Sequence, residues 1–267
     1  MGHYLTQNNS NTKQILKDFL KNYRSHYWDI VHGKNNYCDQ NLDIPTLFSR
    51  IHQQNILHQD QAIHQIEVAL RNESNLNAIA IVGPVGVGKS LFIRALQQNF
   101  PWQENVHTYA WNTYVSDEAE KFHLIRILAE NLSDCGQNLL VVENLHACDN
   151  SAVALINQLL SDTIKKQHKR VVLFYVFNLN TMLPAEAYAI QKDLLQTLPD
   201  CSVVNFNSFT QYELRDCIER EIELENVSLT EEDYDEIVNT IDPMKSGCKN
   251  VNAKVLMYGT IKSKDTN

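Results

Sequence analysis

An eight-residue run in the first third of the chain has the composition and spacing of a phosphate-binding loop. It consists of Gly83, Pro84, Val85, Gly86, Val87, Gly88, Lys89 and Ser90. The run matches Gly-x-x-x-x-Gly-Lys-Ser/Thr at every fixed position, and in that pattern the glycines let backbone N–H groups point at phosphate oxygens. Lys89 is expected to reach the β- and γ-phosphates of a nucleotide, and Ser90 to bind Mg²⁺. The pattern therefore predicts a site for ATP with Mg²⁺.

A second candidate is the apolar run 139–142, which ends in Glu143 and Asn144. ATPases of this kind end the strand in Asp-Glu, where the Asp supports Mg²⁺ and the Glu polarises the attacking water. Glu143 has the chemistry to support the metal through its longer side chain, but Asn144 cannot accept a proton. Because a general base typically contributes about 10²–10⁴-fold, slow hydrolysis at most is expected. The alternative is a buried strand that simply ends in a polar turn.

Asn178 ends the next apolar run, where P-loop ATPases of the AAA+ kind place a polar sensor beside the γ-phosphate. The interval that follows, from Leu179 to Tyr212, has Lys192 as its only cation. Oligomeric ATPases of this class usually carry an arginine finger there, which reaches the nucleotide of a neighbouring subunit. An active form of this chain would therefore need an arginine from a partner.

Apolar runs alternate with amphipathic segments along the middle of the chain. Strands are expected at 79–82, 105–111, 138–144, 170–178 and 202–206. Helices are expected at 44–57, 59–72, 89–99, 117–134, 151–166 and 184–198. This order predicts an α/β fold of the P-loop AAA+ type, with a parallel sheet covered by helices on both faces.

Three regions of different character suggest the domain organisation. Residues 1–45 read as a lead-in with one short helix at 15–23, and 46–208 as the AAA+ nucleotide-binding domain. Acidic helical segments at 210–225, 230–241 and 249–258 then indicate a small, mostly helical domain over 209–267. Tyr114 and Val115 lie where Clp unfoldases carry an aromatic pore loop, but neighbouring glycines are missing and a strand end is expected.

The composition of the 267-residue chain limits its partners and its compartment. A net charge of −9 and a pI near 5.5, without Lys/Arg clusters, argue against nucleic acid as a partner. No apolar stretch approaches the roughly 20 residues of a membrane-spanning helix, and no secretory signal is visible. Asn-x-Ser sequons occur at Asn8, Asn72, Asn131 and Asn226. They would be glycosylation sites in the secretory pathway, or they arise by chance in an Asn-rich chain.

Three motifs in this order resemble the torsins, which are AAA+ proteins related to the Clp chaperones and reside in the lumen of the endoplasmic reticulum and nuclear envelope. They are the segment 43–63, the phosphate loop and the segment 246–258, within a resemblance that covers roughly 38 to 258. Gly247-Cys248-Lys249 is similar to the Gly-Cys-Lys that torsins use as sensor 2. The resemblance implies that Lys249 contacts the γ-phosphate.

The resemblance also implies disulfides and partners. It pairs Cys38 with Cys135 and Cys217 with Cys248, and it leaves Cys148 and Cys201 free. It further implies activation by an AAA+-like lumenal domain of a membrane protein, which supplies the arginine finger, and it allows a homo-oligomer. The chain departs from the torsins in its Glu143-Asn144 pair, in Ser90 where many torsins have Asn, and in the lack of a visible signal peptide.

Two other functions stay open. One is a non-hydrolysing AAA+-like adaptor or regulator that docks on another ATPase, which Asn144 favours. The other is a cytosolic P-loop ATPase whose base lies outside the acid strand and whose six cysteines are reduced. Native disulfides or glycans would exclude the cytosolic alternative.

Overall fold

A computed structural model describes residues 37–72, 74–111, 117–167 and 169–262. The chain divides into two compact units, Met1–Leu42 and Asp43–Asn267. Of the first unit, only Tyr37–Leu42 is described, with a turn over 37–39. The helix expected at 15–23, the sequon at Asn8 and the pair Tyr114-Val115 lie outside the described residues. The boundary expected near residue 208 stays a prediction.

The second unit is built on a sheet of five parallel strands in the order β2-β3-β4-β1-β5. The strands are β1 (Leu76–Gly83), β2 (Val106–Ala110), β3 (Gln137–Leu145), β4 (Arg170–Asn178) and β5 (Ser202–Asn205). The central strands β1 and β4 are buried over almost their whole length, because helices cover both faces of the sheet. The predicted fold class is confirmed.

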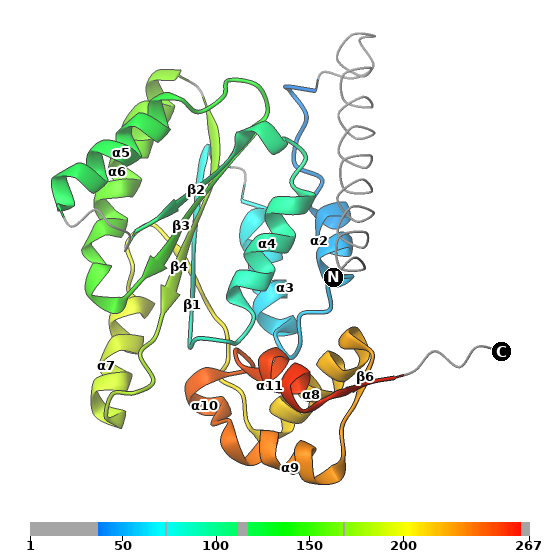
Figure 1. The fold of residues 1–267 in the computed structure, drawn as a ribbon. Coiled ribbons are helices and arrows are strands. Elements are labelled where there is room, and N and C mark those ends of the chain that lie inside the picture. Colours follow the sequence, from blue (N-terminus) through cyan, green and yellow to red (C-terminus); the bar gives the residue numbers. More distant parts are fainter. Residues whose placement is uncertain (1–36, 73, 112–116, 168, 263–267) are drawn as a thin grey trace, which may run out of the picture. The chain divides into compact units, whose positions relative to one another are not determined.

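Helices pack on both sides of the sheet, as Figure 1 shows. On one side lie α2 (Ile44–His52), α3 (Asp60–Leu70) and α4 (Lys89–Asn99). On the other lie α5 (Glu118–Glu130), α6 (Ser151–Gln167) and α7 (Ala185–Gln196). Short 3₁₀ turns, η1 (Gln103–Asn105) and η2 (Ala147–Asp149), precede β2 and α6. No helix within the described parts of the chain combines the length and the apolar character needed to cross a membrane.

Local sequence explains where several helices begin. The side chain of Asp43 accepts a hydrogen bond of 3.2 Å from the N–H of Thr46, and Pro45 occupies the first turn of α2. Thr210 and Glu213 form a capping box at the start of α8 (Gln211–Glu225). Such caps satisfy N–H groups that have no partner inside the helix.

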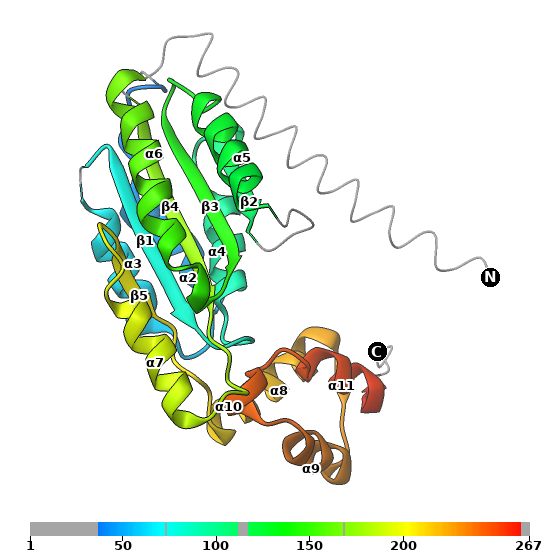
Figure 2. The same cartoon turned by 90° about the vertical axis from the view of Figure 1, so that its left-hand side faces the viewer.

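The C-terminal part of the unit is mostly helical, as expected. Its elements after α8 are β6 (Val227–Ser228), α9 (Glu231–Thr240), α10 (Pro243–Ser246), α11 (Val251–Tyr258) and β7 (Thr260–Ile261). The strands β6 and β7 pair antiparallel and form a sheet of their own. Both ribbon views place α8 to α11 together beyond one end of the parallel sheet (Figures 1 and 2).

Candidate functional site

The phosphate loop joins β1 to α4 as the motif predicts. Gly83 pairs with Asn178 in the register of β1 and β4, and its carbonyl accepts a hydrogen bond of 3.1 Å from the N–H of Leu179. Gly86 and Gly88 have φ angles of 80° and 96°. That left-handed region is readily available only to glycine. The glycines at the predicted positions therefore allow the backbone turn that leads into α4.

Lys89 is a buried cation in the first turn of α4, with 4% of its surface exposed. Its ammonium group donates hydrogen bonds to the carbonyl oxygens of Gly83, at 2.7 Å, and of Pro84. Burial lowers the pKa of Lys89 from 10.5 to about 7. Within the described parts of the chain, no carboxylate forms an ion pair with it. When Lys89 is protonated, its charge is therefore not neutralised by an acidic side chain of the described residues.

A cavity of about 650 Å³ lies against the phosphate loop. Pockets of this size suit a small ligand or cofactor. Its lining residues are Ile56, Leu57, Val85, Gly86, Gly88, Lys89, Ser90, Leu91, Asn144, Asn178, Phe209, Cys217, Arg220, Glu221, Leu224, Cys248 and Lys249. Several predicted site residues from four distant segments, Lys89, Ser90, Asn144, Asn178 and Lys249, therefore meet around one cavity.

Strand β3 is irregular at Glu143 and Asn144. Val142 pairs with Tyr175 and Leu145 pairs with Phe177, so three steps along β3 match two steps along β4. The extra residue makes a β-bulge. Within it, Asn144 has a φ of 62°. Asn tolerates this left-handed conformation better than most residues. The backbone geometry is therefore a structural reason for an Asn at position 144.

Glu143 lies on the sheet face that carries α4. It pairs with Ala110 of β2, so the pairing of β3 with β2 is regular up to this residue. Two residues earlier, Val141 pairs with Phe174, whose ring lies 6.2 Å from that of Phe92 in α4. Side chains two residues apart in a strand share a face. Among the described residues that line the cavity, β3 nevertheless contributes Asn144 and not Glu143.

The segment predicted as sensor 2 lies directly against the phosphate loop. The N–H of Cys248 donates a hydrogen bond of 3.0 Å to the carbonyl oxygen of Gly86. A Cβ on Gly86 would lie 2.0 Å from the carbonyl oxygen of Ser246, so only glycine fits there. Lys249 is exposed and lines the cavity, as expected for a side chain that meets a ligand.

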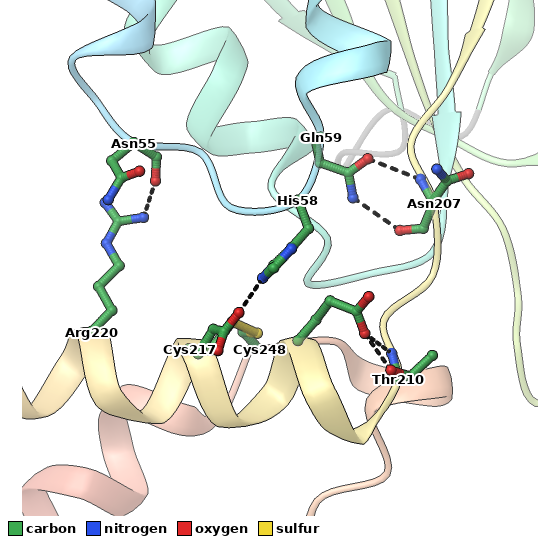
Figure 3. The surroundings of a disulfide bond; sticks show 10 residues. Asn55, His58, Gln59, Asn207, Thr210, Cys217, Arg220 and Cys248 are labelled. Atoms are coloured by element: carbon green, nitrogen blue, oxygen red, sulfur yellow. Dashed lines mark hydrogen bonds and ion pairs between the residues drawn. A yellow bond between two sulfur atoms is a disulfide. The ribbon is translucent and has the colours of Figure 1, made fainter.

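One of the two disulfides implied by the resemblance, Cys217–Cys248, is present among the described residues. A disulfide joins Cys217 of α8 to Cys248, with a Cα–Cα distance of 6.2 Å (Figure 3). Cys38 and Cys135 are each disulfide-bonded as well. Cys148 and Cys201 are free, and burial raises the pKa of the Cys201 thiol to about 12. The disulfide of Cys217 and Cys248 attaches the segment that carries Lys249 to α8.

Sequence reasoning missed the apolar part of the cavity and the arginine among the described residues that line it. Ile56 and Leu57 come from the connector between α2 and α3, which we define as residues 53–59, and Leu224 comes from α8. Arg220 is one of two arginines in an acidic helix, the other being Arg215, and nothing in the local sequence distinguishes it. Only the packing of α8 beside the connector brings these residues to the cavity.

A second hollow, of about 580 Å³, lies between α5 and α6. Its lining mixes the cations Arg126 and Lys166 with the anions Glu130 and Asp162. It includes no residue of the phosphate loop, and none of the predicted site residues. The chemistry indicated by the sequence therefore belongs to the first cavity.

No protein-family profile matches the sequence, and no curated protein is similar to it at a significant level. Solved structures, in contrast, share its fold. A chain of Hsp104, in a closed state with ATPγS and casein, aligns with a TM-score of 0.57 at 13% identity, over 82% of this chain and 47% of that one. This chain thus spans about half the length of the Hsp104 chain. Domain III of the replication initiation protein DnaA from Thermotoga maritima aligns with a TM-score of 0.50 at 12% identity, over 81% and 87%. The fold is that of AAA+ proteins.

Proposed function

We propose that the chain is an AAA+ protein that binds ATP with Mg²⁺ in the cavity at the phosphate loop. The observation that carries this proposal is Lys89, a buried ammonium group whose hydrogen bonds go to carbonyl oxygens. An isolated buried charge is unfavourable unless an opposite charge compensates it. The phosphates of a nucleotide would supply that charge, and the backbone of the loop is already shaped to receive them.

The other predicted site residues, including Glu143 beside the cavity lining, have roles that follow from their chemistry. Ser90 offers a hydroxyl ligand at the start of α4, and Glu143 supports the same ion from the end of β3 through water. The bound Mg²⁺ would neutralise phosphate charge. Asn178, beside Gly83 in the sheet, and Lys249, beside Gly86, contact the γ-phosphate and distinguish ATP from ADP.

Hydrolysis is slow or depends on a partner. Asn144 occupies the cavity position from which a glutamate would polarise water, and an amide cannot serve as a base. The interval from Leu179 to Tyr212 contains no arginine. In the torsin-like form of the proposal, an AAA+-like lumenal domain of a membrane protein supplies the missing arginine. A homo-oligomer is the alternative source of neighbouring subunits.

The compartment we propose is the lumen of the endoplasmic reticulum and nuclear envelope. Disulfides persist in oxidising compartments, and the described sequon asparagines Asn72, Asn131 and Asn226 are all exposed. Native protein should therefore shift in mobility after glycosidase treatment and resist thiol labelling at Cys217 and Cys248. Unshifted mobility together with labelling of these cysteines would support the cytosolic alternative.

The test of nucleotide binding compares two lysines. Titration of the full chain with fluorescent ATP and Mg²⁺ should show binding that Lys89→Ala abolishes. Lys192→Ala removes the same charge from the exposed surface of α7 and should leave binding unchanged. If the wild-type chain binds no nucleotide, or if Lys89→Ala binds as tightly as wild type, the proposal is wrong.

A second candidate function is that of a non-hydrolysing adaptor of another ATPase. The bulge in β3 favours it, because the strand geometry at Asn144 suits Asn and disfavours the usual Glu. This adaptor would bind ATP or nothing, and would show no turnover with any partner. Turnover that appears upon addition of an arginine-bearing partner domain would exclude it.

A further inference from the structure

The connector between α2 and α3 places two apolar residues, Ile56 and Leu57, in the wall of the cavity. Two residues with left-handed backbone flank them, Asn55 with a φ of 50° and His58 with a φ of 56°. Such a conformation costs about 1–2 kcal/mol for residues other than glycine, and less for Asn. The path of the connector must therefore be held by contacts with the rest of the molecule.

Those contacts come from one face of α8, as Figure 3 shows. The guanidinium group of Arg220 donates to the carbonyl oxygen of Gln54, at 2.9 Å, and to that of Asn55. One turn earlier, Asp216 Oδ2 lies 2.6 Å from His58 Nε2. Residues four apart lie side by side on a helix. Asp216 and Arg220 therefore form hydrogen bonds with the connector on both sides of Ile56 and Leu57.

The end of the connector is fixed independently of α8. The Gln59 side chain donates to the carbonyl oxygen of Asn207 at 3.0 Å and accepts from its N–H at 3.0 Å (Figure 3). Gln59 is also buried, with 1% of its surface exposed. Because this pair anchors the start of α3, loss of the α8 contacts should release residues 54–58 without detaching the helix.

The connector also touches the phosphate loop. A Cβ added to Gly88 would lie 3.0 Å from Cγ2 of Ile56. A displacement of Ile56 would therefore change the space between the apolar wall and the loop. The polar part of the cavity, with Lys89 and Ser90, suits a triphosphate, and the apolar wall suits the flat face of a nucleobase.

We propose that Arg220 and Asp216 are positioning residues for nucleotide binding. They hold the connector so that Ile56 and Leu57 form the wall against which the base packs, while the phosphate loop binds the triphosphate without them. This inference rests on the proposed function, because it assumes that the cavity binds a nucleotide. According to this inference, the part of the ATP affinity that comes from packing of the base depends on the contacts that α8 makes with the connector.

The test measures affinity for ATP and for inorganic tripolyphosphate, each with Mg²⁺, on the full chain. Arg220→Gln and Asp216→Asn should each weaken ATP binding by about tenfold, as expected for lost hydrogen bonds to a charged group. Binding of tripolyphosphate should stay within about twofold of wild type. The matched controls Arg94→Gln and Asp193→Asn, at exposed positions of α4 and α7, should change neither affinity.

The pattern of losses separates the alternatives. If both ligands weaken equally in Arg220→Gln, the arginine acts on phosphate or on the fold, and the positioning role is wrong while ATP binding stands. If wild type binds tripolyphosphate and ATP with equal affinity, no base wall operates and the inference fails. If wild type binds neither, the proposed function fails and this inference with it.

Two further variants separate a positioning role from misfolding and test whether the two residues act together. Arg220→Lys keeps the charge but cannot span both carbonyl oxygens, so it should lose part of the ATP affinity and keep the folded state. The double variant Asp216→Asn/Arg220→Gln should lose less than the product of the two single losses, since both residues hold one segment. If the double variant loses ATP affinity by the full product of the two single losses, the two residues do not act together on the connector.

Discussion

The main-chain N–H of Cys248 donates a hydrogen bond of 3.0 Å to the carbonyl oxygen of Gly86. This bond joins the C-terminal helical segment to the phosphate loop. The approach is close because Gly247, with a φ of 52°, precedes Cys248, and a Cβ at that position would lie 2.5 Å from the same carbonyl oxygen. The segment that carries Lys249, the proposed sensor, and the phosphate loop are therefore fixed to each other through main-chain atoms.

Gly247→Ala should separate the two segments. The added methyl group overlaps the Gly86 carbonyl, and the left-handed backbone disfavours any side chain. We expect the free energy of unfolding to fall by about 1–3 kcal/mol, measured by urea denaturation, together with weaker ATP binding. Asn250→Ala, at an exposed position whose side chain caps no helix, is the control. Unchanged ATP affinity in Gly247→Ala would show that this contact does not shape the site.

Removal of the disulfide between Cys217 and Cys248 should destabilise the chain. The bond closes a loop with a sequence separation of 31, for which the chain-entropy model gives roughly 3 to 4 kcal/mol. We expect the double variant Cys217→Ser/Cys248→Ser to show this loss in urea unfolding. Cys148→Ser replaces an exposed free thiol and should have no effect. A loss as small as that of the control would mean that other contacts hold α8 in place.

ATP binding should depend on pH through Lys89. Burial holds the pKa of Lys89 at about 7 in the free protein, and a bound phosphate would raise that pKa again. Below pH 7 the lysine is already protonated; above it, binding must take up a proton, so affinity should fall as pH rises. Calorimetry in buffers of different ionisation enthalpy should detect this uptake at pH 8. Lys89→Arg, which stays charged, should lose it, and equal uptake in that variant would assign the proton elsewhere.

The same lysine gives a prediction for stability. Because the folded-state pKa of Lys89 lies below its ordinary value of 10.5, the unfolded chain binds more protons between these two values. The free energy of unfolding should therefore rise with pH from about 7 to 10.5. Comparison with Lys89→Met across this range isolates the contribution, since methionine does not titrate. An identical pH dependence in both proteins would contradict the assigned pKa.

Substitution of Asn144 should test the missing base. We expect Asn144→Glu to raise single-turnover hydrolysis by about 10²-fold or more, while the left-handed backbone lowers its stability by about 1 kcal/mol. Asn144→Asp should keep the stability of wild type and gain less activity, because its carboxylate is shorter. Asn144→Gly relaxes the same backbone without adding a base and should show no gain. A gain in the glycine variant would mean that flexibility, and not a base, limits turnover.

Local patterns were sufficient for much of the fold. The strand from Leu76 to Gly83, the turn after it and α4 follow from an apolar run, three spaced glycines and an amphipathic segment, all of which act within a few residues. The five strands and most helices of the described region lie close to the predicted ranges. The helix expected at 44–57 is an exception, because α2 ends at His52, and the short helix α10 was not predicted. The paired strands β6 and β7 were missed because two residues carry no detectable periodicity.

The sequence by itself determined the phosphate loop, the acid strand, the strand-end Asn178 and the α/β class, since each depends on short-range pattern. Only the tertiary structure decided the strand order, the bulge that gives Asn144 a left-handed backbone and the contact between Cys248 and Gly86. It also brought Arg220 to the connector, 165 residues away in the chain. Contacts between distant segments depend on how whole elements pack, and local preferences contain no information about that packing.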